Sequence, residues 1–228
     1  MKIRLAKYLA DHGLCSRRAA SRLIDEGRVL VNQRPANHID HVDEEDSIQV
    51  DGQPFRAVAE KHYLLYHKPV GIDCNLNPEK ADSLYHLLQQ FPMRLFPVGR
   101  LDKDSCGLVL LTNDGELTQR LLHPDFYHEK TYQVTVDIAL TTQALAQLAS
   151  GVSWTVGPHT YQSRPCQVTQ LSSNRFEIVL TQGLNRQIRY MCRSVGLKVV
   201  QLKRIQLAQF SLADLAEGCF QTVNLSAG

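Results

Sequence analysis

A charged, turn-rich loop runs directly into an apolar segment in residues 96–117, which read FPVGRLDKDSCGLVLLTNDGEL. The loop at 97–107 contains a proline, two glycines and several charged side chains, and four consecutive apolar residues follow at 108–111. A short apolar run bounded by turn residues is typical of a strand that is buried on both faces. A loop held by such a strand is a suitable platform for a reactive group, because the scaffold limits the movement of its side chains.

Two carboxylates of this loop, Asp102 and Asp104, admit two interpretations. They could act together in general acid–base chemistry, but a spacing of two residues in a loop does not define the distance between two carboxyl groups. Alternatively, Asp102 caps a turn, a role that aspartate often has. The residues by themselves leave both interpretations open.

A second dense group of polar residues lies at 181–189, which read TQGLNRQIR. We expect the chain to turn through Gly183 into a helix over residues 185–195. Arg186 and Arg189 are three residues apart and are predicted to share one face of that helix. Because the two like charges repel each other, we expect a carboxylate or a phosphate close to them.

Short strands with a few helices between them make up the rest of the chain after residue 61. The pattern predicts strands at 63–66, 108–111, 132–136, 176–180 and 199–202, and helices at 82–91, 115–122, 141–149 and 185–195. Because strands dominate, we predict an α+β fold with a mixed, largely antiparallel sheet over residues 61–228.

The charges are distributed unevenly along the chain, although the formal net charge is only +2. Residues 1–34 carry eight basic and three acidic side chains, residues 35–60 carry one and seven, and residues 175–204 carry seven and one. Two separate basic segments indicate a polyanion that contacts both. The alternative is that these charges belong to solvated faces, as charge runs often do.

The first basic segment has the pattern of two short amphipathic helices. The first helix is expected to end near Gly13 and the second to begin after an N-cap at Ser16 and to end at Gly27. The inward positions are then Leu5, Tyr8 and Leu9 in the first helix and Ala19, Ala20, Leu23 and Ile24 in the second. This arrangement leaves three arginines facing outward, Arg17, Arg18 and Arg22. With short strands after it, the segment 1–60 is predicted to be a small binding module.

Several other classes of protein are excluded or disfavoured. The composition, 43% hydrophobic and 21% charged, is that of a globular protein rather than a disordered or fibrous one. No phosphate-binding glycine motif and no serine-hydrolase motif occurs, and the six cysteines and nine histidines lack metal-ligand spacing. We therefore expect no metal and no cofactor. The sequence shows neither a signal peptide nor a membrane-spanning segment, so we expect a cytoplasmic protein, and nothing in it demands more than a monomer.

Residues 4–36 resemble the αL-type RNA-binding module first described in a ribosomal small-subunit protein, and they read RLAKYLADHGLCSRRAASRLIDEGRVLVNQRPA. Four further segments resemble, in the same order, the motifs of the RsuA/RluF-type pseudouridine synthases. They are HKPVG at 67–71, the segment 96–117, HEKTYQVTV at 128–136 and TQGLNRQIRYM at 181–191. The resemblance covers nearly the whole chain. One departure is Tyr190, where the family usually has a further arginine.

The resemblance implies a role for particular residues. Asp102 would be the catalytic carboxylate, which either adds to C6 of the target uracil or attacks C1′ of its ribose. An ionised carboxylate in a dry pocket needs a charged partner, and by motif position this is Arg189, with Arg186 as the second candidate. Further roles implied by the resemblance are stacking on the flipped base for Tyr132, filling the gap left by that base for Arg100, a pocket wall for Leu180, and RNA contacts for Arg17, Arg18 and Arg22.

The RNA substrate implied by the resemblance is ribosomal RNA, with the large subunit favoured because TQGLNRQIR is similar to the RluF-like branch. Small-subunit ribosomal RNA or a transfer RNA remains an alternative. A non-catalytic ribosome-assembly factor would explain the basic segments but not the loop around Asp102. An RNA-directed glycosidase or nuclease that used Asp102 and Asp104 would lack metal ligands and a firm second carboxylate.

Overall fold

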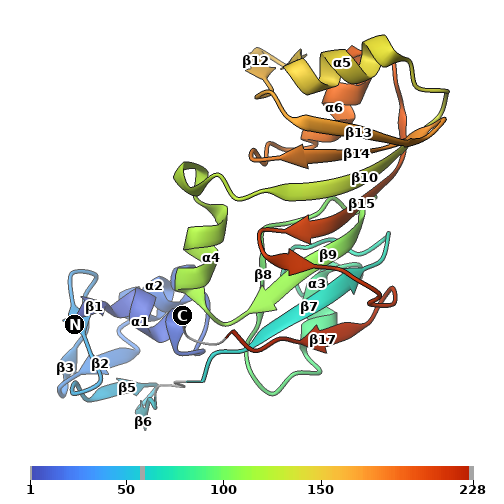
Figure 1. The fold of residues 1–228 in the computed structure, drawn as a ribbon. Coiled ribbons are helices and arrows are strands. Elements are labelled where there is room, and N and C mark those ends of the chain that lie inside the picture. Colours follow the sequence, from blue (N-terminus) through green and yellow to red (C-terminus); the bar gives the residue numbers. More distant parts are fainter. Residues whose placement is uncertain (1, 57–59, 226–228) are drawn as a thin grey trace.

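The N-terminal residues form a small module beside a long, curved sheet that makes up most of the molecule (Figure 1). The computed structural model describes residues 2–56 and 60–225. No helix in these two ranges is long and apolar enough to cross a membrane. In chain order, the module contains β1 (Ile3–Arg4), α1 (Leu5–Asp11), α2 (Arg17–Asp25), β2 (Val29–Val31), β3 (Arg34–Pro35), β4 (His41–Val42), β5 (Ile48–Val50) and β6 (Gln53–Pro54).

The two helices of the module pack through the apolar faces predicted from their spacing. Leu5 and Leu9 of α1 and Ala20 and Ile24 of α2 are buried together with Val29 at the start of β2. The strands form a four-stranded sheet in the order β3-β2-β5-β6 and a separate β1–β4 pair. Burial of one face of each helix stabilises elements that would be too short to persist alone.

The predicted ends of α2 are confirmed, because both are set by local chemistry. The side chain of Ser16 accepts a hydrogen bond from the backbone N–H of Ala19 at 3.1 Å, which is the geometry of an N-cap. At the other end the chain leaves the helix through Gly27, whose φ of +69° is readily available only to glycine. The three arginines predicted to face outward are exposed, Arg17, Arg18 and Arg22.

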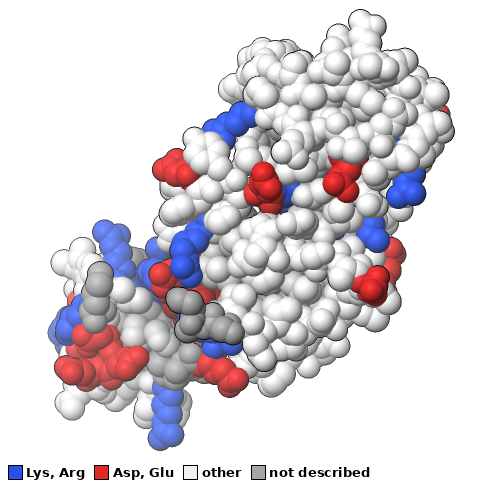
Figure 2. Space-filling view, in the orientation of Figure 1, with Lys and Arg blue, Asp and Glu red and all other residues white. Residues whose placement is uncertain are grey.

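The acidic segment of the module neutralises part of its basic segment. Three ion pairs join the two, Lys2 with Asp46 at 2.9 Å, Arg28 with Asp51 at 2.7 Å and Arg34 with Asp40 at 2.7 Å. Figure 2 shows Lys, Arg, Asp and Glu side chains crowded together on the module. Within the described ranges the arginines of α2 form no ion pair, so they remain available for an external anion.

The large sheet has nine strands and is antiparallel except for one pair. Its central path runs β13-β14-β10-β15-β9-β7-β17, with β16 paired to β15 and β8 paired to β9. The parallel pair is β15–β9. The strands are β7 (Tyr63–Lys68), β8 (Phe96–Val98), β9 (Cys106–Thr112), β10 (Lys130–Val136), β13 (Gln167–Ser172), β14 (Arg175–Leu180), β15 (Val199–Leu207), β16 (Phe210–Ser211) and β17 (Phe220–Thr222). The predicted α+β class with a mixed, largely antiparallel sheet is confirmed, and β9 is buried over its whole length, as the apolar run predicted.

Helices cover the two halves of this sheet separately (Figure 1). They are α3 (Leu84–Leu88), α4 (Gly115–Leu122), the short 3₁₀ helix η1 (Pro124–Phe126), α5 (Thr142–Ser150) and α6 (Gln187–Ser194). Helices α5 and α6 bury Leu148 and Met191 against Phe176 and Ile178 of β14, whereas α3 buries Leu84 in a second cluster with residues of β7 and β9. A hairpin of β11 (Ser153–Val156) and β12 (His159–Gln162) lies apart from the main sheet.

Two predicted helices are shorter than expected. The helix predicted over 82–91 spans only Leu84–Leu88, because Ser83 caps its start with its side chain. The helix predicted over 185–195 begins at Gln187, because Arg186 lies in the left-handed region with φ +51° and serves as the N-cap. Arg186 and Arg189 therefore do not share a helix face, although both reach the same carboxylates.

Candidate active site

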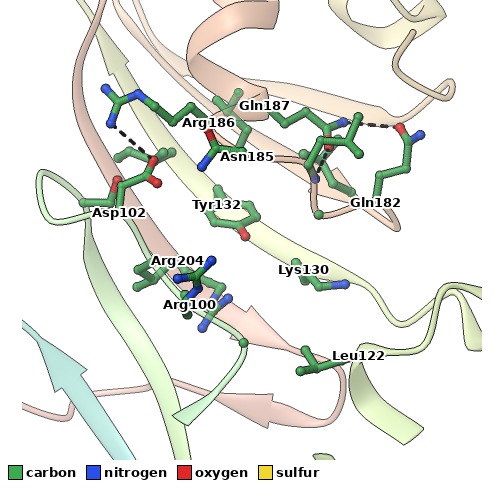
Figure 3. Close-up of a pocket in the computed structure, with 18 of the residues that line it drawn as sticks. Arg100, Asp102, Leu122, Lys130, Tyr132, Gln182, Asn185, Arg186, Gln187 and Arg204 are labelled. Carbon is green, nitrogen blue, oxygen red and sulfur yellow. Dashed lines mark hydrogen bonds and ion pairs between the residues drawn. The ribbon is translucent and has the colours of Figure 1, made fainter. Parts of the chain in front are cut away.

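A cavity of about 770 Å³ lies where the loop after β8, the start of β10 and the segment between β14 and α6 converge. Figure 3 shows side chains from all three segments pointing into it. Its lining includes Arg100, Asp102, Lys130, Tyr132, Arg186 and Arg204. The cavity thus brings together the two polar segments described from the sequence, 96–117 and 181–189, which lie far apart along the chain.

The loop that carries Asp102 is fixed by its own backbone. The N–H of Ser105 donates to the carbonyl of Asp102 at 3.0 Å, and the N–H of Gly71 donates to the carbonyl of Lys103 at 2.8 Å. The side chain of Leu101 is buried in the core next to the loop. Asp102 itself remains 25% exposed and points into the cavity (Figure 3). The carboxylate of Asp102 is therefore accessible while its backbone is held in place.

Two arginines lie within ion-pair distance of Asp102 but do not hydrogen-bond it. Arg186 Nη1 lies 3.8 Å and Arg189 Nε lies 4.0 Å from Asp102 Oδ2. The Nε atom of Arg189 is buried and has no hydrogen-bond partner within the part of the chain that the structure describes. The structure therefore brings both arginines singled out from the sequence to Asp102.

The direct hydrogen bonds of the two arginines go to Asp104 and, for Arg189, also to the hydroxyl of Ser105 at 3.2 Å. Arg186 Nη2 lies 3.0 Å from Asp104 Oδ2, and Arg189 Nη2 lies 3.2 Å from Asp104 Oδ1. Arg189 Nη2 also donates to the backbone carbonyl of Asp104 at 2.9 Å. Burial raises the pKa of Asp104, but the hydrogen bond from Arg186 and the charges of both arginines outweigh burial, so this pKa lies below its usual range. Asp104 thus acts as the anchor of the arginine pair, a role that loop spacing alone did not reveal.

Tyr132 and Leu180 lie on neighbouring strands, two register positions apart, and both line the cavity. Tyr132 lies in β10 between Ile178 of β14 and Arg204 of β15, is half-buried, and points into the cavity (Figure 3). Leu180 lies opposite Lys130 in β14 and is 4% exposed, so it forms part of the cavity wall. The ring of Tyr132 is placed so that a planar group can pack against it.

The remaining residues singled out from the sequence are exposed. Arg100 is exposed and lines the same cavity. Arg17 and Arg18 instead line a second hollow of about 610 Å³, between the helices of the N-terminal module and α4. Leu122 and His123 line both hollows. Arg22 is exposed on α2 but does not line either hollow.

Sequence reasoning missed several basic residues of the cavity, among them Lys130 and Arg204. Lys130 lies two positions before Tyr132, so the period of a strand places both on one face. Arg204 lies two positions after the buried Leu202 in β15, so the strand period places it, a charged residue, at an inward position. That conflict between charge and predicted burial is the signal that could have identified it.

Comparison with known proteins identifies the class. Residues 62–194 match the family model of the RNA pseudouridylate synthases, and residues 3–54 match that of the S4 domain. The chain belongs to the RNA pseudouridylate synthase family, with an N-terminal S4 domain, and is an isomerase that acts on RNA. This confirms the resemblance derived from the sequence motifs.

Individual relatives cover most of the chain. It is 38% identical to the dual-specificity RNA pseudouridine synthase RluF of Escherichia coli K12 over 95% of this chain and 73% of that protein. It is 33% identical to the ribosomal large subunit pseudouridine synthase B of Bacillus subtilis, over 94% of this chain and 89% of that protein. Among solved structures, it is similar to a pseudouridylate synthase with a TM-score of 0.68 and 27% identity, over 97% of this chain and 96% of that one.

Proposed function

We propose that the cavity isomerises a specific uridine of ribosomal RNA, with Asp102 as the catalytic carboxylate. The observation that carries the proposal is the placement of Asp102, which points into the cavity with two guanidinium groups at 3.8 and 4.0 Å. Their positive charge offsets the desolvation of an ionised carboxylate in a site that must exclude water. Arg189, the more buried of the two, is the principal partner, and Arg186 adds a second charge.

The reaction exchanges one bond to the ribose for another without any change of oxidation state. The N1–C1′ bond breaks, the uracil rotates, a C5–C1′ bond forms, and the proton lost from C5 is balanced by one gained at N1. Asp102 assists either by addition to C6 of the base or by attack at C1′ of the ribose. Tyr132 packs against the base while it rotates.

The target uridine has to leave its stack before it can reach Asp102. Extrusion of a base costs a few kcal/mol of stacking. Arg100, exposed at the mouth of the cavity, is suited to fill the gap with its planar guanidinium group. Leu180 supports the extruded base as an apolar wall.

The names of the relatives favour ribosomal RNA of the large subunit, since the Bacillus subtilis relative is named for it. Small-subunit ribosomal RNA and transfer RNA are the alternatives.

We assign RNA binding outside the cavity to residues 1–60, with Arg17, Arg18 and Arg22 as phosphate contacts, and the reaction to residues 61–228. The two hollows share Leu122 and His123 in their linings, which supports one RNA path along both.

Two measurements test this proposal together. Purified protein is incubated separately with large-subunit ribosomal RNA, small-subunit ribosomal RNA and transfer RNA, each labelled with tritium at uridine C5, and release of tritium reports the exchange at C5. Pseudouridines are then mapped chemically in ribosomal RNA from cells with and without the protein. We expect tritium release and one or a few sites that depend on the protein. Tritium release only from transfer RNA, or only from small-subunit RNA, would overturn the assignment to the large subunit.

A further inference from the structure

Arg204 is a buried cation with an unused hydrogen-bond donor at the cavity. Its residue is 2% exposed, and its Nε donates to the backbone carbonyl of Leu108 at 2.8 Å. Its Nη2 is buried and has no partner within residues 2–56 and 60–225. A buried guanidinium donor without a partner is costly, and it indicates a group that the cavity receives from outside.

Lys130 places a second positive charge near Arg204. It is half-buried in β10, and its Nζ donates to the carbonyl of His128 at 3.0 Å. Burial lowers the pKa of Lys130, and the charge of Arg204 lowers it further. Figure 3 shows both side chains below Tyr132, whereas Arg186 lies above it. The two cations therefore share one part of the cavity, where the exposed Arg100 lies beside Arg204 (Figure 3).

No carboxylate of the described residues forms an ion pair with either cation. The cavity therefore has two electrostatic halves. In one half, Asp102 and Asp104 balance Arg186 and Arg189. The other half carries positive charge without a counter-charge, which favours an incoming anion over a neutral ligand.

We propose that Lys130 and Arg204 bind a phosphate of the RNA backbone adjacent to the flipped uridine. This inference rests on the proposed function, because it takes the uridine to enter the same cavity. A phosphodiester offers a full negative charge and acceptor oxygens suited to a guanidinium group. The carbonyl groups of uracil accept hydrogen bonds but leave the two positive charges without an anion.

A phosphate held at this position would act on the geometry of the reaction. Once the N1–C1′ bond has broken, base and ribose are no longer joined, and C1′ has to stay in place while the uracil rotates. A fixed backbone phosphate restrains the ribose during that step, which preserves the alignment that the new C5–C1′ bond requires. Lys130 and Arg204 are thus positioning residues rather than catalytic ones.

Uncharged methylphosphonate linkages in a synthetic substrate test the contact directly. The probe is an RNA hairpin that contains the uridine mapped in ribosomal RNA, made in three forms. The first hairpin has phosphodiester linkages throughout. The second carries one uncharged methylphosphonate linkage on the 5′ side of that uridine, and the third carries one on its 3′ side. Single-turnover rates are measured for wild-type protein, Lys130→Gln, Arg204→Lys and the control Lys203→Gln, which removes a neighbouring charge from the opposite face of β15.

We expect one of the two methylphosphonates to slow the wild-type protein by roughly tenfold to a hundredfold, the range of a hydrogen bond to a charged group. Lys130→Gln should be slow on the all-phosphate hairpin and should lose most of its sensitivity to that same methylphosphonate. Arg204→Lys, which keeps the charge, should retain the sensitivity, and Lys203→Gln should match the wild type. Equal sensitivity of wild type and Lys130→Gln to both methylphosphonates would overturn the inference. If the wild-type protein is inactive on the all-phosphate hairpin, this result contradicts the proposed function itself. The inferred phosphate site is then contradicted as well, because it rests on that function.

Discussion

Arg189 Nε lies 4.0 Å from Asp102 Oδ2, while Nη2 of the same guanidinium group donates to the backbone carbonyl of Asp104 at 2.9 Å. One planar group thus holds the backbone of the loop and faces the carboxylate that the loop presents. Because the Nε atom has no other partner in the described chain, a small movement of Asp102 would complete a hydrogen bond. The position of the carboxylate and the charge around it therefore depend on the same side chain.

Asp102→Asn is expected to abolish pseudouridine formation, because an amide cannot supply the nucleophilic carboxylate. The expected loss of rate is on the order of 10⁴-fold or more, as for other residues that act directly in covalent catalysis. RNA affinity, measured in a filter-binding assay, should change less than about twofold. An active Asp102→Asn protein would exclude the mechanism, and an unchanged melting temperature serves as the control for folding.

Arg189→Gln is expected to reduce the rate more than Arg186→Gln. The side chain of Arg189 is 15% exposed and that of Arg186 is 41% exposed, so solvent screens the charge of Arg186 more strongly. A loss of roughly a hundredfold for Arg189→Gln and about tenfold for Arg186→Gln would agree with this difference. Single-turnover rates on one RNA measure it, and the reverse order would make Arg186 the principal partner of Asp102.

Asp104→Asn should weaken the anchor of both arginines, and its effect on stability should depend on pH. The pKa of Asp104 is lowered in the folded protein, so its ion pairs stabilise the fold above the unfolded pKa near 3.8. This stabilisation disappears as the pH falls through the lower folded-state pKa. Urea unfolding between pH 3 and 7 should therefore show a difference between wild type and Asp104→Asn at pH 7 that shrinks toward pH 3. A difference that grows at low pH would contradict this assignment.

Gly107→Ala is expected to destabilise the junction between β9 and β15. Gly107 has a φ of +110°, and an added Cβ would lie 2.6 Å from the backbone nitrogen of Arg204 and closer still to its carbonyl oxygen. Only glycine allows the two strands to approach in this way. We expect a loss of about 3 kcal/mol or more in the free energy of unfolding.

Gly157→Ala is the matched control for this substitution. Its φ is also positive, at +58°, but nothing lies within 4 Å of an added Cβ. Backbone strain alone should cost about 1 kcal/mol there. Equal losses for Gly107→Ala and Gly157→Ala would show that the close approach to Arg204 contributes nothing.

Simultaneous replacement of Arg17, Arg18 and Arg22 by Gln should weaken RNA binding mainly at low salt. If each arginine neutralises one phosphate, the slope of log affinity against log salt should flatten by up to about three units. Lys2, Arg28 and Arg34 already pair with acidic residues of the module, so Arg28→Gln should change the slope less than a single arginine of α2. An unchanged slope in the triple variant would show that these arginines do not contact phosphates and belong to an ordinary solvated face.

The sequence by itself determined features whose causes lie within a few residues of each other. The Ser16 cap, the amphipathic face of α2 and the buried strand β9 follow from capping, helical period and a continuous apolar run, and all three are observed. The ordered motifs around Asp102, Tyr132 and Arg189 also identified the class of enzyme, because its chemistry depends on short segments. The helix predicted over 185–195 begins two residues later, because Arg186 has a left-handed backbone conformation and ends the preceding loop; its side chain pairs with Asp104, which lies outside the segment.

Only the tertiary structure decided which charges meet. The arginines predicted to need a carboxylate find Asp104, which lies 82 and 85 residues away along the chain. The acidic segment 35–60 neutralises part of the basic segment 1–34 through ion pairs. Counting the charges of each segment could not show which side chains would pair. Lys130 and Arg204 come together because the pairing of β10 with β15 places Tyr132 opposite Arg204, and Gly107 lets β9 approach at that level. Such contacts depend on strand register and close backbone approach, and local sequence patterns encode neither.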